Sequence, residues 1–244
     1  MRICVNKLSH FYGSRLVFKD LSFCLPATSV TLLAGANGAG KSTLLKILAG
    51  LVHPSAGEVS YPDRNNTAAE GDQSIGYLGH QTFIYPEMTA AENLLFWARL
   101  YGKSIEPEKE LARVELAMFA DEKAGGFSRG MAQRLNLARV FMLQPDIVLL
   151  DEPGTGLDTR STAILHEHIA AFRHKGAAVV WITHSLEQDL CRADAVLYLE
   201  GKKLAYQGEA AHFSLFPDTS PPVQPAPVQP EPAHSRKASG GDVC

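Results

Sequence analysis

One glycine-rich segment constrains the fold of this 244-residue chain more than any other feature of the sequence. It follows an apolar run, Val30–Ala34, with the length and composition of a buried strand, and it precedes a helical pattern, Leu44–Ala49. Glycines let the backbone curl until successive N–H groups point inward, and the helix N-terminus adds partial positive charge there. The sequence therefore predicts a phosphate-binding loop in an α/β fold. The loop consists of Gly35, Ala36, Asn37, Gly38, Ala39, Gly40, Lys41, Ser42 and Thr43.

Two side chains at the end of this segment complete the pattern of a P-loop. Lys41 supplies the positive charge that neutralises β- and γ-phosphates, and the hydroxyl of Ser42 is a ligand for Mg²⁺. The full pattern between a strand and a helix is far more specific than a lone glycine motif. It predicts a site for ATP and Mg²⁺.

Further apolar runs extend the α/β prediction. Ile147–Leu150 and Ala178–Ile182 are short, rich in β-branched residues and followed by polar segments, as strands of parallel sheets are. Near the end, Ala195–Leu199 and Lys203–Tyr206 flank Glu200-Gly201, which predicts a hairpin. The expected fold is therefore an α/β P-loop NTPase core with a mixed sheet and a helical subdomain.

The domain organisation follows from changes in pattern along the chain. Thr89 and Glu92 form a predicted capping box, and helical spacing continues behind them, so residues of about 86–138 are expected to be a helical insertion. Residues 1–216 are expected to form one ATPase domain. Residues 217–244 are rich in proline, without apolar periodicity, and are expected to be a disordered tail.

Three polar residues follow the predicted strands at the edge where ligands collect. Asp151 comes directly after Ile147–Leu150 and is expected to hold Mg²⁺, whereas Glu152 is expected to polarise the attacking water as general base. His184 follows the strand Ala178–Ile182 and is expected to stabilise charge that develops on the γ-phosphate. The sequence thus predicts an ATPase with Glu152 and His184 as catalytic residues.

Charge and hydropathy exclude several classes of function. The formal net charge of −3 gives no sign of a nucleic-acid partner, and Lys202-Lys203 is interpreted as a solvated turn. No apolar run approaches the ~18–20 residues that span a bilayer, and Met1–Lys7 lacks the features of a signal peptide. We therefore expect a protein of the cytosol.

The cysteines are expected to be reduced and mostly buried, without a disulfide framework or a zinc site. They lie far apart in the sequence and form no CxxC pair. They are Cys4, Cys24, Cys191 and Cys244.

Several segments together resemble the ABC ATPase family, over about residues 3–208. Phe127–Leu135 is similar to the LSGGQ signature, Gly154–Asp158 looks like the D-loop, and Tyr12 stands where the family stacks an aromatic ring on adenine. The resemblance implies a head-to-tail homodimer in which the signature of one subunit completes the nucleotide site of the other. The residues that it implies for this role are Ser128, Arg129, Gly130 and Asp158. Arg129 departs from the usual glycine, and it is expected either to add charge near phosphate or to face solvent.

A second departure lies after the predicted strand Ile75–Leu78. The family usually carries a single glutamine there, but this chain has Gly79-His80-Gln81, so either His80 or Gln81 is expected to sense the nucleotide and its Mg²⁺. The run is similar to that of the haem-exporter ATPases of cytochrome c maturation. The resemblance implies a peripheral subunit on the cytoplasmic face of the inner membrane that drives a separate permease in haem export.

Other functions stay open at this point. Exporters of lipids, polysaccharides or drugs share the Ser-Arg-Gly-Met signature. An ABC protein acting on ribosomes or DNA, and a catalytically inactive scaffold, are further alternatives. Four apolar residues before the helical insertion, Phe83, Ile84, Tyr85 and Met88, are expected either to contact the permease or to pack within the subdomain.

Overall fold

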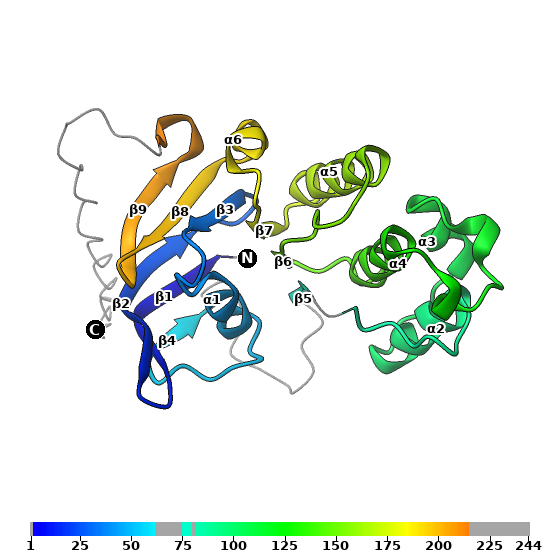
Figure 1. Ribbon diagram of the computed structural model, residues 1–244, viewed down its shortest axis with the longest axis horizontal. Helices are drawn as coiled ribbons and strands as arrows, with labels where there is room; N and C mark the ends of the chain where they lie inside the picture. The colour runs from blue at the N-terminus through cyan, green and yellow to red at the C-terminus, as the bar shows by residue number, and fades with distance from the viewer. Residues whose placement is uncertain (1, 62–74, 80–81, 215–244) are drawn as a thin grey trace, which may run out of the picture. The chain divides into compact units, whose positions relative to one another are not determined.

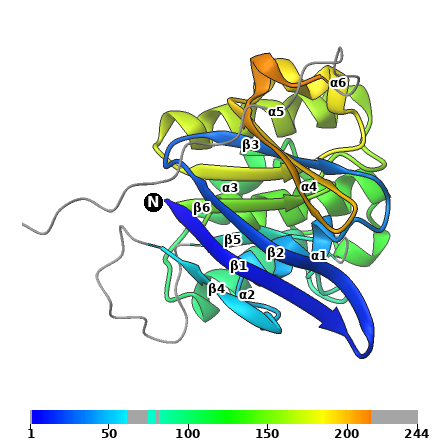
Figure 2. The ribbon, with the colours of Figure 1, turned by 90° about the vertical axis from the view of Figure 1, so that its left-hand side faces the viewer.

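The computed structural model describes residues 2–61, 75–79 and 82–214, and its strands form two sheets (Figures 1 and 2). The smaller sheet has the antiparallel order β2-β1-β4, formed by β1 (Ile3–Tyr12), β2 (Arg15–Leu25) and β4 (Ala56–Ser60). Its strands β1 and β2 form the hairpin that carries Tyr12. The residues from Met1 to Phe213 make one compact unit.

The larger sheet holds the predicted strands and has the order β5-β6-β7-β3-β8-β9. Neighbouring strands are parallel from β5 to β8, and β9 is antiparallel to β8, so the predicted mixed sheet and terminal hairpin are confirmed. The strands are β3 (Val30–Gly35), β5 (Ile75–Leu78), β6 (Ile147–Asp151), β7 (Ala178–Ile182), β8 (Ala195–Glu200) and β9 (Lys203–Glu209).

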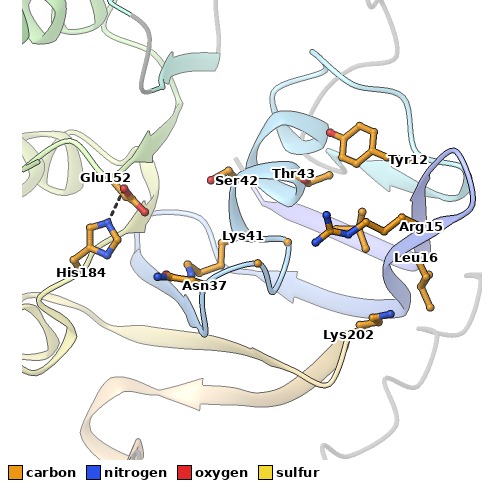
Figure 3. Close-up of a pocket in the computed structure, with 13 residues that line it drawn as sticks. Tyr12, Arg15, Leu16, Asn37, Lys41, Ser42, Thr43, Glu152, His184 and Lys202 are labelled. Carbon is orange, nitrogen blue, oxygen red and sulfur yellow. Dashed lines mark ion pairs between the residues drawn. The ribbon is translucent and has the colours of Figure 1, made fainter.

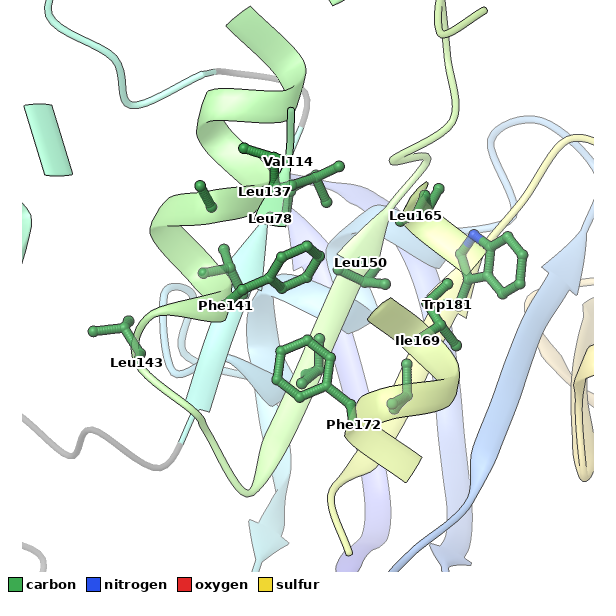
Figure 4. Packing of buried hydrophobic residues seen from close by; sticks show 14 of the residues in the cluster. Leu78, Val114, Leu137, Phe141, Leu143, Leu150, Leu165, Ile169, Phe172 and Trp181 are labelled. Carbon is green, nitrogen blue, oxygen red and sulfur yellow. The ribbon is translucent and has the colours of Figure 1, made fainter. Parts of the chain in front are cut away.

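Both faces of this sheet are covered by other elements. Successive side chains of a strand point to opposite faces, so they are buried in two different clusters. On β6, Ile147 and Leu149 pack toward α1 (Lys41–Leu48) and the first hairpin, whereas Val148 and Leu150 pack toward the other helices. All five residues of β6 are buried. The close-up of the second cluster shows Leu150 and Trp181 of the sheet among residues of the covering helices (Figure 4). The polar end of β6 is thereby fixed between two apolar layers.

The remaining helices cover the sheet and form the helical part of the fold. They are α2 (Ala90–Leu100), α3 (Pro107–Arg113), α4 (Arg129–Phe141), α5 (Thr159–His174) and the short α6 (Leu186–Asp189). Single turns of 3₁₀ helix occur at Ala117–Phe119, Ala124–Gly126, Leu190–Arg192 and Ala210–His212. Helices α2, α3 and α4 pack against one another, and Figure 1 shows them gathered in green.

The capping box at the start of α2 is confirmed. The Thr89 side chain accepts a hydrogen bond from the Glu92 N–H, and the Glu92 carboxylate accepts one from the Thr89 N–H. One turn further, the buried Asn93 holds the preceding segment. Its amide donates to the carbonyl oxygens of Tyr85 and Thr89 at 3.0 and 2.9 Å, and its oxygen accepts from the Tyr85 N–H at 2.7 Å.

The helix boundaries differ from those expected in two places. Helix α1 begins at Lys41 rather than Leu44, because Gly40 is its N-cap and the polar first turn carries no apolar periodicity. Helix α4 continues to Phe141, beyond the expected limit at residue 138, because Val140 and Phe141 pack into the core.

The prediction for the cysteines is wrong for the first two. Strands β1 and β2 bring Cys4 directly opposite Cys24, with their Cα atoms 4.2 Å apart, and the two form a disulfide. Their distance in sequence hid the pairing, because cross-strand register depends on the hairpin. Cys191 is a free thiol but is exposed rather than buried. Cys244 lies outside the described residues, as does the predicted tail.

Among the residues that the structure describes, no helix combines the length and the apolar character required to cross a membrane.

Candidate functional site

The P-loop lies where the sequence predicts it, between β3 and α1. Gly40 has a left-handed φ of 97°, and a Cβ there would come within 2.7 Å of Val17 Cγ1. Only glycine satisfies both conditions, because other residues rarely adopt that φ and any side chain would collide with β2. The first hairpin therefore packs directly behind the loop and helps to fix its shape.

Lys41 is held across the loop that precedes it. Its ammonium donates to the carbonyl oxygens of Gly35 and Ala36 at 2.8 and 3.0 Å. Burial lowers the pKa of Lys41, while the nearby carboxylates of Glu152 and Asp151 oppose that shift and favour the charged form. The ammonium is thus poised at the mouth of the loop, where a phosphate can replace the two carbonyl oxygens.

The end of β6 meets the start of α1. The hydroxyl of Ser42 donates to Oδ1 of the buried Asp151 at 3.0 Å. Hard oxygen ligands of this kind are those that Mg²⁺ prefers, so the pair fits the predicted cation. The neighbouring Tyr77 stays protonated at neutral pH, because burial and the charge of Asp151 raise its pKa to about 12.

Glu152 and His184 are in direct contact. The Nε2 atom of His184 lies 2.7 Å from Oε2 of Glu152. Glu152 directly follows the end of β6 and has a left-handed φ of 54°. A backbone conformation of this kind in a non-glycine residue is strained and is often found at functional sites.

These residues surround one pocket of about 550 Å³ (Figure 3). Glu152 and His184 lie at one end of it, Tyr12 and Arg15 at the other, and Lys41 between them. The order matches an extended ligand with its phosphates beside the carboxylate and its base beside Tyr12. Predicted residues that line the pocket are Tyr12, Asn37, Gly38, Gly40, Lys41, Ser42, Thr43, Glu152 and His184.

Four residues of the pocket were not identified from the sequence. Arg15, Leu16 and Val17 come from the start of β2, and Lys202 comes from the turn between β8 and β9. The expected solvated turn at Lys202-Lys203 is confirmed, and Lys202 also lines the pocket. A hydrogen bond from the Lys19 N–H to the Lys202 carbonyl oxygen joins the two elements at 3.0 Å. No local motif signals this approach, because it depends on contacts between distant segments.

The signature segment does not line this pocket. Ser128 caps α4 by accepting a hydrogen bond from the Met131 N–H at 3.2 Å. Asp158 caps α5 in the same way, accepting from the Ser161 N–H at 2.7 Å, and this bond lowers the pKa of its carboxyl. Arg129 is exposed, and its guanidinium lies against Gly156 of the predicted D-loop.

The residues predicted to follow β5 are only partly described. His80 and Gln81 lie outside the described residues. The preceding Gly79 is described and buried, and a Cβ there would lie 2.7 Å from the hydroxyl oxygen of Tyr77. A side chain at that position would require Tyr77 to move, which explains the glycine.

Comparisons with known proteins agree with this geometry. Residues 18–155 match the family described as ABC transporter. The chain is 35% identical over 200 residues to the ABC transporter ATP-binding protein NatA of Bacillus subtilis, covering 78% of this chain and 80% of that one. It is 36% identical over 207 residues to the Nod factor export ATP-binding protein I of Burkholderia lata, covering 80% of this chain and 66% of the relative.

A solved structure described as the ATP-binding subunit of an ABC transporter has the same fold. It superposes with a TM-score of 0.78 at 28% identity and covers 86% of this chain and 90% of its own. The expected fold class is confirmed, and the ATPase activity follows from the family. This chain belongs to the ABC transporter family as an ATP-binding subunit that hydrolyses ATP.

Proposed function

We propose that this subunit powers an exporter whose membrane permease is a separate chain, with Glu152 and His184 as its catalytic residues. The observation that carries the proposal is the convergence of Lys41, the Ser42–Asp151 pair and the Glu152–His184 pair around one pocket. The Nod factor export relative supports the direction of transport.

The polar residues at and beside the pocket would divide the work of hydrolysis. Lys41 exchanges its two carbonyl partners for β- and γ-phosphate oxygens, and Tyr12 stacks on the adenine. Glu152 orients the attacking water and accepts its proton. His184, beside Glu152, donates to the γ-phosphate as negative charge develops there. Ser42 and Asp151 would hold Mg²⁺, together with Gln81, and the cation would neutralise phosphate charge.

A second copy of the chain would complete the site. Ser128 and Arg129 are exposed and do not line the pocket of their own chain, and Ser128 caps a helix whose N-terminus can face an anion. In a head-to-tail homodimer, residues Ser128–Gly130 of one copy would face the γ-phosphate bound by the other. Asp158 would join the same interface beside its capped helix.

The surface for the permease is an exposed apolar patch on the helical part. It consists of Phe83, Tyr85, Phe96 and Leu100, which are 37–63% exposed. The rings of Tyr85 and Phe96 lie 4.8 Å apart, and both contact Trp97, as Phe83 also does, so the aromatic members form one cluster. An exposed apolar cluster of this kind favours a protein partner. Ile84, by contrast, is partly buried and packs against the core, so it is not part of the exposed patch.

The patch is mechanically linked to the sheet. The buried Arg139 lies 5.2 Å from the ring centroids of both Phe83 and Trp97, and its guanidinium donates to the carbonyl oxygen of Tyr77 at 3.1 Å. Tyr77 belongs to β5, which pairs with β6, the strand that ends at Asp151. Arg139 thus contacts both the patch and β5, and it offers a route by which movement of the patch would reach the sheet.

The test is a comparison of two exposed positions. Tyr85→Asp should abolish co-purification of the permease from membranes while the isolated subunit keeps its ATPase activity. Met118→Asp, at a position 93% exposed outside the patch, is the matched control and should retain the permease. Retention of the permease by both variants would contradict the assigned surface.

Haem is the candidate cargo that the sequence favours, through the resemblance of Gly79-His80-Gln81 to the haem-exporter ATPases. Deletion of the gene in a cell that makes c-type cytochromes should then stop covalent haem attachment. The b-type cytochromes, which need no such attachment, are the internal control and should persist. Normal c-type cytochromes in the deletion strain would reject haem and leave an exporter of other cargo.

A further inference from the structure

The loop that carries His184 is held by a network of side chains. Strand β7 ends at Ile182, and the chain then passes through Thr183, His184 and Ser185 before α6 begins at Leu186. His184 is more than half exposed, so packing alone does not fix its ring. Its position depends on the residues at either side.

The side chain of Thr183 forms hydrogen bonds to residues that follow His184. Its hydroxyl accepts a hydrogen bond from the Ser185 N–H at 3.0 Å and donates one to Oδ2 of Asp189 at 2.6 Å. The first bond closes a tight turn around His184, and the second ties that turn to the end of α6. A single oxygen atom thus fixes the backbone on both sides of His184.

Asp189 anchors this bridge from inside the protein. It is only 4% exposed, and its second oxygen, Oδ1, lies 3.4 Å from Nε2 of His166 and 3.9 Å from the guanidinium of Arg192. Burial lowers the pKa of His166, with a smaller contribution from Arg192 that Asp189 opposes. Both oxygens of Asp189 therefore have partners, one on the His184 loop and the other on His166 and Arg192.

The network also borders a second cavity. About 410 Å³ in volume, it is lined by Thr183, Asp189 and His166, and it shares Glu152 and His184 with the nucleotide pocket. The Glu152–His184 pair thus borders both the nucleotide pocket and the second cavity. The second cavity offers room for the His184 ring to move away from Glu152. Besides its contact with Glu152, the ring depends on the backbone of its loop, which the hydroxyl of Thr183 ties to Ser185 and Asp189.

We propose that Thr183 and Asp189 are positioning residues for hydrolysis, which keep the His184 ring against Glu152. The inference rests on the proposed role of His184. Neither residue lines the nucleotide pocket, so their loss should leave ATP binding intact and slow the chemical step.

The experiment measures ATP turnover and ATP affinity of the full chain. Thr183→Val keeps the shape of the side chain but removes both hydrogen bonds, and it should lower kcat about tenfold with little change in KM. Thr183→Ser keeps the hydroxyl and should restore turnover to near the parent value. Asp189→Asn keeps an oxygen that accepts from Thr183, and it should fall between the two.

A matched control separates positioning from general damage. The hydroxyl of Thr31 is buried on β3 and accepts or donates no hydrogen bond among the described residues, so Thr31→Val should leave kcat unchanged. If Thr183→Val lowers the melting temperature and ATP affinity along with kcat, the residue is merely structural and the inference is overturned. Equal losses in Thr183→Val and Thr183→Ser would overturn it too.

His184→Ala distinguishes this inference from the proposed function. It should lower turnover by ~10²–10³, as the removal of a positioned donor does. Turnover like the parent in His184→Ala would refute the catalytic role of the histidine itself. An inactive His184→Ala beside a fully active Thr183→Val would refute the positioning role alone.

Discussion

The P-loop and the signature segment each precede a helix, yet their surroundings differ. At the start of α1, Gly40 is packed against β2, and Lys41 is bound to two carbonyl oxygens of its own chain. At the start of α4, Ser128 and Arg129 are exposed; Ser128 caps the helix, and Arg129 lies against Gly156. The contacts that shape the P-loop all come from the same chain. The signature segment has the form of a surface that needs a partner.

This difference explains why the two segments should respond differently to substitution. Changes at the first site should affect binding or chemistry in a single chain. Changes at the second should affect only steps that require two copies. The substitutions below test the contrast, in order of expected effect.

Glu152→Gln should have the largest effect on turnover. The glutamine cannot accept the proton of the attacking water, so turnover should fall by ~10²–10⁴, while ATP binding persists because the P-loop is untouched. Phosphate release and nucleotide binding are measured on the same preparation. Glu187→Gln, an exposed position on α6, is the control. Near-normal turnover in Glu152→Gln would remove the general base from the mechanism.

Lys41→Ala should weaken both ATP binding and turnover. The ammonium is the cation placed for the β- and γ-phosphates, and the loss of such a contact costs ~10²–10³ in rate. Titration with a fluorescent ATP analogue measures the affinity. Lys46→Ala, exposed on the same helix, should behave like the parent. Unchanged affinity in Lys41→Ala would show that the nucleotide binds elsewhere.

Ser128→Arg should spare ATP binding and block assembly. The large side chain would occupy the space expected for the γ-phosphate of the other copy. In the Glu152→Gln background, ATP should convert the parent to a dimer on a sizing column, whereas Ser128→Arg stays monomeric. Met118→Arg adds the same side chain elsewhere and should still dimerise. An ATP-dependent Ser128→Arg dimer would contradict the head-to-tail arrangement.

Gly156→Ala should have the smallest effect, a reduction of turnover of about 3–10-fold. Its left-handed φ of 79° costs ~1–2 kcal/mol for alanine, and its Cβ would come within 2.7 Å of Arg129 Nε. Gly50→Ala has a similar φ of 73° but open space around its Cβ, so it incurs the backbone cost alone.

Arg129→Ala then tests whether the contact matters. The double variant Arg129→Ala/Gly156→Ala should lose less turnover than the two single losses combined, because the Arg129 side chain that would collide with the new Cβ is absent. Strict additivity of the two substitutions would show that Arg129 and Gly156 are independent.

The sequence predicted those parts of the molecule that depend on local pattern. The strands Ile75–Leu78 and Ala178–Ile182 and the capping box at Thr89 lie as expected, because apolar runs and caps are properties of neighbouring residues. The side chains of Lys41 and Glu152 meet in one pocket because parallel strands end at the same edge of a sheet.

The remaining features depend on contacts between distant segments. Lys202 reaches the pocket only because the turn after β8 is bonded to β2. Cys4 faces Cys24 only in the register that the first hairpin adopts. Neither pairing leaves a periodic trace in the sequence. The roles of Ser128 and Asp158 toward a second copy stay predictions for the same reason, since they concern another molecule.

Asn93 has a consequence for how force travels through the subunit. Its amide spans the residues from Tyr85 to Thr89, and Trp97 adds a hydrogen bond from its indole to the carbonyl oxygen of Phe83 at 2.8 Å. The segment before α2 is therefore stapled to the helix along its whole length. These hydrogen bonds restrict movement of the segment relative to the helix. We therefore expect that a displacement of Tyr85 by a few ångströms moves α2 with it.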